Sequence, residues 1–184
     1  MKSQNASKAP DAITLLTEDH KKVLKLFKDF EKLGEQDDSE GKDELVRQIC
    51  TELTVHAQIE EEIFYPAVRD AISNDDMLDE AEVEHASAKD LIAQLESMQP
   101  GDELYDAKVT VLGEYISHHV KEEQGEMFPK VKKADLDLAA LGEAMQQRKE
   151  ELLGELEEAN ERDGAARSKS GSKHSRNSGA PARH

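Results

Sequence analysis

The sequence has a single cysteine, Cys50, and no tryptophan among its 184 residues. A lone cysteine excludes an internal disulfide and is typical of the reducing cytoplasm, where we expect this chain to reside. No apolar run approaches the roughly 20 residues that cross a membrane, and the first residues, MKSQNASKAPDA, contain no apolar signal segment. We therefore expect a cytoplasmic protein that does not bind membranes.

Basic residues are also scarce: the chain has 24 Lys and Arg but 41 Asp and Glu, which gives a formal net charge of −17. Residues 1–161 carry 18 basic and 40 acidic side chains, a charge of −22, and the basic remainder is available to an anionic partner. This acidic body is not expected to bind nucleic acid, since phosphate contacts need a basic face. The sequence also shows neither a nucleophile paired with a base nor a phosphate-binding glycine loop.

Charged residues make up 35% of the chain and aromatics 4%, which is typical of helices with solvated faces. Caps, glycines and prolines predict an all-α fold, an antiparallel up-down-up-down four-helix bundle with an extra C-terminal helix and a disordered basic tail. We expect a kink or local break at Pro66, and an end of the fourth helix before Pro129. The expected parts are a disordered leader (1–10), the bundle (11–130), an additional amphipathic helix (131–160) and a disordered Ser/Gly/basic tail (161–184).

Apolar residues recur at intervals of three and four in each bundle helix, so each helix presents one stripe to the core. In the first helix this stripe includes Leu16, Val23 and Phe27. Polar residues interrupt all four stripes, and their spacing places them in the core. They are His20, His56, Glu60, His85, His119 and Glu123.

A histidine on an apolar stripe is more often a hydrogen-bonded core residue than a ligand. One histidine on each of four helices, with a glutamate one turn after two of them, is harder to explain in that way. Each buried carboxylate would cost several kcal/mol without a positive partner, and no Lys or Arg occupies the central stripe positions. The pattern therefore predicts bound metal, and six ligands indicate two ions. Imidazole and carboxylate without thiolate favour iron or manganese over structural zinc.

Two segments, HAQIEEEIFYP (56–66) and HVKEEQGEMFP (119–129), share a His, a Glu four residues later and a Pro ten residues later. Helical side chains four residues apart lie on one face, so each His and Glu can reach a common centre. The separations His20 to His56 and His85 to His119 are similar, at 36 and 34 residues. We therefore expect two hairpins related by an approximate two-fold axis, with two His on each metal and both carboxylates as bridges.

Together with His20 and His85, these segments resemble the hemerythrin-like HHE cation-binding domain of bacteria, over roughly residues 11–130. The resemblance implies a non-haem di-iron centre with an oxo or hydroxo bridge. It implies chemistry with dioxygen, peroxide or nitric oxide, or sensing of iron or oxygen. The implied terminal ligands are His20, His56, His85 and His119, and the implied bridges are Glu60 and Glu123.

The chain departs from oxygen-carrying hemerythrins, which have a second His one turn from the third-helix ligand, where this chain has Ala81 and Lys89. Their fourth-helix carboxylate is an Asp five residues after its His, and here it is Glu123 at four. The departures imply a more symmetric site with an extra open position, for which Glu82 is the candidate ligand, although helical Glu is more often solvated. We expect Glu61, Glu62 and Glu122 to be solvated, and His118 to lie at the surface or directly behind the metal ligands. Tyr115, one turn before His119, could bond to a metal-bound species, but a partly buried structural role is favoured. Phe64, Tyr65 and Phe128 are expected to close the end of the bundle.

Three classes of function remain open. The leading one is a di-iron protein that binds or reduces a small ligand, with enzymatic activity undecided. The alternative is an iron or oxygen sensor, or an iron-handling protein, that signals to a partner through the fifth helix. A metal-free interaction module is disfavoured by the six stripe positions. A ferritin-like oxidase is disfavoured because it needs Glu-x2-His on two helices, and only Glu82 and His85 offer it.

Overall fold

The computed structural model describes residues 9–34, 39–72 and 75–171. Most of the leader predicted for residues 1–10, and the tail from residue 172 onward, lie outside this range. The described residues form helices and no strand, so the prediction of an all-α fold is confirmed. The elements are α1 (Ala12–Gly34), α2 (Ser39–Ile59), the π-helical turn η1 (Glu60–Phe64), α3 (Tyr65–Ala71), α4 (Asp75–Glu96), α5 (Tyr105–Glu122), the π-helical turn η2 (Glu123–Met127), α6 (Phe128–Val131) and α7 (Leu138–Gly171).

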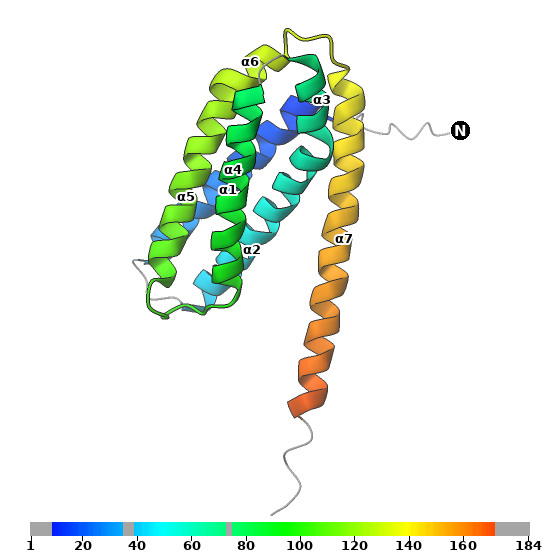
Figure 1. The fold of residues 1–184 in the computed structure, drawn as a ribbon. Helices are drawn as coiled ribbons and strands as arrows, with labels where there is room; N and C mark the ends of the chain where they lie inside the picture. The colour runs from blue at the N-terminus through cyan, green and yellow to red at the C-terminus, as the bar shows by residue number, and fades with distance from the viewer. Residues whose placement is uncertain (1–8, 35–38, 73–74, 172–184) are drawn as a thin grey trace, which may run out of the picture. The chain divides into compact units, whose positions relative to one another are not determined.

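Four long helices, α1, α2, α4 and α5, lie side by side around one core (Figure 1). Helix α1 packs against α2 and α5, and α4 packs against the same two helices. The apolar stripes predicted from the sequence are buried, including Leu16, Phe27, Ile49 and Leu112. Burying one such side chain stabilises the fold by about 1.5–3 kcal/mol, so the stripes fix which face of each helix turns inward.

The two prolines of the repeated segments are each preceded by a π-helical turn. Proline has no N–H, and the chain adapts by forming bonds that span five residues, from Tyr65 N–H to the Glu60 carbonyl and from Phe128 N–H to the Glu123 carbonyl. The local break predicted at Pro66 is therefore a π turn. The fourth helix, α5, ends at Glu122, before Pro129 as predicted, and Pro129 lies in the first turn of α6, where its missing N–H is not needed.

The chain divides into two compact units, residues 1–149 and 150–184. In the first unit, Gly142 in the first turns of α7 packs closely against the backbone of Pro10 and Asp11, just before α1. A Cβ added to Gly142 would lie 2.1 Å from the carbonyl oxygen of Pro10, so only glycine fits this contact.

Helix α7 continues to Gly171, so the prediction of a disordered tail from residue 161 is wrong for residues 161–171. An ion pair one turn apart, between Glu158 and Arg162, supports the helix at the point where the tail was expected to begin. Of the helices that the structure describes, none is both long and apolar enough to cross a membrane.

Candidate metal centre

The structure brings all six predicted site residues together in the core of the bundle. Each of α1, α2, α4 and α5 contributes one histidine, and Glu60 and Glu123 open the two π turns. All six side chains are buried, and Glu60 is 0% exposed. Their assignment as metal ligands stays a prediction, but their placement in one cluster is a feature of the fold.

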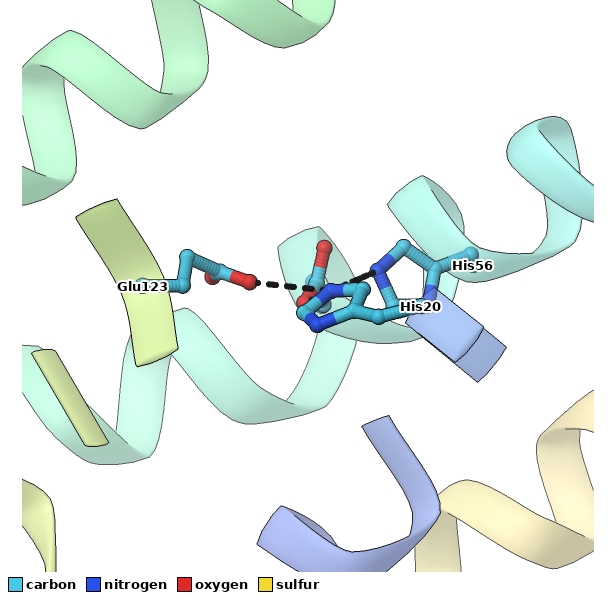
Figure 2. A group of neighbouring side chains, drawn as sticks. His20, His56 and Glu123 are labelled. Carbon is cyan, nitrogen blue, oxygen red and sulfur yellow. Dashed lines mark hydrogen bonds and ion pairs between the residues drawn. The ribbon is translucent and has the colours of Figure 1, made fainter. Parts of the chain in front are cut away.

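One half of the cluster contains His20, His56 and an oxygen from each glutamate. The Nε2 atoms of His20 and His56 are 3.0 Å apart, and His20 Nε2 lies 3.2 Å from Glu123 Oε2 (Figure 2). His56 Nε2 lies 3.3 Å from Glu60 Oε1. These four ligand atoms lie within 4.8 Å of one another, which is close enough for one ion to contact them all.

The other half contains His85 and His119. Their Nε2 atoms are 3.3 Å apart, and His85 Nε2 lies 3.3 Å from Glu60 Oε2. Glu60 therefore presents one carboxylate oxygen to each histidine pair. Glu123 Oε2 lies between the pairs, 3.2 Å from His20 Nε2 and 3.6 Å from His119 Nε2.

The buried charges strongly shift the ionisation of the cluster. Burial lowers the pKa of His56, but the charges of Glu60 and Glu123 and the nearby Asp19 outweigh burial and raise it to about 10. Burial raises the pKa of Glu60, but His56 and His85 reverse this and hold it well below its ordinary value. Without another cation, protons on His56 and His119, whose pKa values are both raised, balance the carboxylates.

The donor set fits bound metal. Glu60 Oε1 and Glu123 Oε2 are fully buried and have no hydrogen-bond partner among the described residues. The ion pairs of these two carboxylates, within the described part of the chain, are with imidazoles and not with Lys or Arg. A divalent ion would replace the imidazole protons and satisfy the two orphaned oxygens at the same time.

A polar group on a neighbouring element faces the outer Nδ1 atom of each histidine. Asp19 lies 3.6 Å from His56, Glu61 2.9 Å from His85, Glu84 2.8 Å from His119, and the Gln124 amide 3.0 Å from His20. Such partners fix the tautomer and orientation of histidines that bind metals. Two partners directly precede a cluster histidine in the sequence and two directly follow a cluster glutamate, so the arrangement repeats in both halves.

These outer partners were not predicted from the sequence. Glu61, expected to be solvated, bonds to both His85 and Lys89. Asp19 also bonds to Lys149 of α7, the last residue of the first unit. A signal was available, since Asp19 and Glu84 occupy equivalent positions in the two repeats, as do Glu61 and Gln124.

Tyr65 is the other residue whose place in the cluster the sequence did not reveal. Its hydroxyl donates a hydrogen bond to Glu123 Oε1 at 3.0 Å and lies 3.3 Å from His85 Nε2. Burial and the charges of Glu60 and Glu123 raise the pKa of Tyr65 well above its ordinary value, so the phenol stays protonated. Its counterpart in the repeat is Phe128, whose ring stacks on that of His20 with 6.0 Å between the ring centroids. Phenylalanine has no hydroxyl, so the Tyr65 hydroxyl makes the two halves of the cluster different.

Glu82, the further candidate ligand, does not lie in the cluster. Its side chain is 56% exposed and pairs with Arg69 at 3.0 Å. His118 is at the surface as predicted, with Glu122 3.0 Å away. Tyr115 is 48% exposed and is therefore less buried than expected.

A cavity of about 20 Å³ adjoins the cluster. All four histidines line it, together with apolar side chains such as Val23, Leu53 and Ile92. This volume holds about one water-sized molecule. The cluster therefore has space for a very small ligand in apolar surroundings.

Comparison with known proteins gives two similar chains. A crystal structure of a hemerythrin HHE cation-binding domain-containing protein from Mycobacterium kansasii matches with a TM-score of 0.65 and 26% identity, over 79% of this chain and 89% of that one. A DNA nickase from Nostoc sp. (strain PCC 7120) is 31% identical over 114 residues, which are 62% of this chain and only 31% of the nickase. The model of the hemerythrin HHE cation-binding domain family matches residues 11–131, which include all six cluster residues. The chain therefore belongs to the hemerythrin HHE cation-binding domain family.

Proposed function

We propose that this protein holds two iron ions in the buried cluster and uses them to bind or reduce a small ligand, namely dioxygen, peroxide or nitric oxide. The observation that carries the proposal is that the two carboxylate oxygens of Glu60 face two different histidine pairs. A single ion would leave one pair and one oxygen without a partner. The proposal takes α1, α2, α4 and α5 as the antiparallel up-down-up-down bundle expected from the sequence, which their ring of contacts supports.

His20 and His56 would hold one ion and His85 and His119 the other, with Glu60 and Glu123 shared. When bound, two iron ions supply electrons in one- or two-electron steps. The chain's own residues control the surroundings. Glu61, Glu84 and Gln124 orient their imidazoles through hydrogen bonds, and Asp19 faces His56 at 3.6 Å. The Tyr65 hydroxyl donates a hydrogen bond to Glu123, and the apolar cavity admits only a very small ligand.

Redox or sensing chemistry is favoured over reversible oxygen carriage. A carrier must release dioxygen without oxidising its metals, which requires exclusion of water and protons. Here a pocket lined by exposed acidic residues reaches His119 and Glu123, and the Tyr65 hydroxyl lies at the centre of the cluster. The pocket admits water, which supplies protons, and the Tyr65 hydroxyl supplies a hydrogen bond; both favour irreversible oxidation.

The test is to mix iron-loaded, reduced protein with oxygen and follow the absorption spectrum. We expect rapid oxidation to a ferric protein that binds azide and reacts with peroxide or nitric oxide. Full recovery of the reduced spectrum under vacuum would instead indicate a carrier.

The alternative is a sensor or iron-handling protein, and a specific contact favours keeping it. Lys149 at the end of the first unit bonds to Asp19, which faces His56, and Arg148 bonds to Glu62 at 2.7 Å. Metal at His56 would therefore change the group that anchors α7. Hydrogen exchange of residues 138–149 should slow on iron binding if the protein signals in this way, and should not change if it does not.

The nickase similarity does not lead us to propose nuclease activity. The shared segment covers under a third of that enzyme, and the body of this chain is strongly acidic, which opposes binding to phosphates. We propose that the shared segment is a cation-binding module, in a cytoplasmic protein that binds neither membranes nor nucleic acid through this body. Nicking of supercoiled plasmid by the purified chain would contradict this.

A further inference from the structure

A pocket of about 300 Å³ between α4 and the α5–η2 segment is lined mainly by acidic side chains. Lys130 is the one basic residue among those that line it. His119 and Glu123 of the buried cluster also line this pocket, so it reaches the proposed metal centre. The acidic residues outside the cluster are Asp76, Glu80, Glu84, Glu122 and Glu126.

Beside this pocket lies a second group of metal-binding side chains, separate from the six buried residues. His118 Nε2 lies 3.0 Å from Glu122 Oε1 and 3.7 Å from Glu84 Oε1. The three residues offer ligand atoms that all lie within 4.8 Å of one another. His118 is 61% exposed, so an ion can reach this group directly from solvent.

Two observations connect this outer group with the buried cluster. Glu84 contacts both, because Oε1 faces His118 while Oε2 accepts a hydrogen bond from His119 Nδ1 at 2.8 Å. Glu123, which lines the pocket, is 1% exposed, and its Oε2 has no hydrogen-bond partner among the described residues. An ion at the outer group would thus share Glu84 with the buried cluster, and the pocket leads from it to Glu123, whose ion pairs are with His20 and His119.

We propose that Glu84, His118 and Glu122 form an outer divalent-cation site, where Fe²⁺ or Mn²⁺ is captured before it moves through the acidic pocket to the buried cluster. Two carboxylates and one imidazole suit these ions, and the remaining positions would be filled by water. A negative pocket raises the local concentration of cations and the rate at which they arrive. The proposal rests on the buried metal centre proposed above. The competing explanation is a surface His–Glu ion pair, which contributes little to stability and binds no metal.

The test uses the full-length chain stripped of metal and titrated with Mn²⁺, with free Mn²⁺ measured by electron paramagnetic resonance. The variant is His118→Ala combined with Glu122→Gln; Glu84 is kept because it positions His119. The matched control is Glu44→Gln, which removes one acidic charge from the exposed face of α2. We expect a third, weaker Mn²⁺ in the wild type and in the control, and its loss in the double variant.

The capture step is tested by the rate of Fe²⁺ uptake under anaerobic conditions. We expect the double variant to load about tenfold more slowly than the control, with the same final iron content after a chelator wash. A third Mn²⁺ that persists in the double variant would overturn the outer site, and an unchanged loading rate would overturn the capture step. In both cases two tightly bound ions would leave the proposed function standing. A wild-type chain that binds no tight metal would overturn both proposals.

Discussion

The Tyr65 hydroxyl gives a sharp prediction, because Tyr65→Phe removes one oxygen without leaving a large cavity. Tyr65 is 2% exposed, and its hydroxyl bonds to the charged Glu123 at 3.0 Å. A buried hydrogen bond to a charged group contributes about 1.5–3 kcal/mol. We therefore expect the free energy of unfolding of the metal-free protein to fall by that amount, and the melting temperature to fall on the order of 5 °C.

Urea unfolding followed by circular dichroism measures this change. The control is Tyr105→Phe, since Tyr105 is equally buried but begins α5, far from the cluster histidine at the other end of that helix. We expect the control to lose less, because it removes no hydrogen bond to a buried carboxylate of the cluster. Equal losses in the two variants would show that the contact with Glu123 has no special strength.

Three further predictions concern the cluster and the core. Glu123→Gln should abolish tight binding of at least one iron, whereas Glu82→Gln should retain both, because Glu82 is exposed and pairs with Arg69. Metal analysis after a chelator wash measures the iron content of both variants. The opposite order would show that the ligands of the fourth bundle helix have been misassigned. In the metal-free protein, the folded pKa of His56 is about 10 against about 6.5 when unfolded. Its contribution is thus fully present below pH 6.5 and lost as pH rises towards 10, so urea unfolding should show a fall of up to several kcal/mol, and a flat profile would contradict it. Cys50 is buried, and burial together with the nearby charge of Glu96 raises the pKa of its thiol to about 12. Iodoacetamide should therefore label Cys50 only when the protein is unfolded in urea. Rapid labelling of the native protein would refute its burial.

The sequence was sufficient to predict the cluster because the six residues lie on helical stripes. Their spacing of three and four fixed their inward direction, and the repeat of His, Glu and Pro fixed their pairing. The same periodicity could not place Tyr65, which lies after a π turn. That turn adds a residue to the helical repeat and rotates every following side chain, so the α-helical spacing no longer applies.

The outer partners were missed for a different reason. Asp19 and Glu84 lie one position before a cluster histidine, and such residues normally face away from that histidine's stripe. They reach the histidine of the adjacent helix instead, and only the packing of two helices shows this. Glu82 shows the opposite error. Its spacing of three residues from His85 suggested a metal ligand, but in the structure it forms an exposed ion pair with Arg69.

The central claim is that the buried cluster holds two iron ions, and the direct measurement is the iron content of the purified chain reconstituted anaerobically with Fe²⁺. Unfolding in urea before and after removal of the metal is measured on the same preparation. We expect two irons per chain and a loss of stability on their removal of about 2.7 kcal/mol or more, the value for a ligand at 100 times its dissociation constant. A single zinc per chain, or no metal with undiminished stability, would contradict the account.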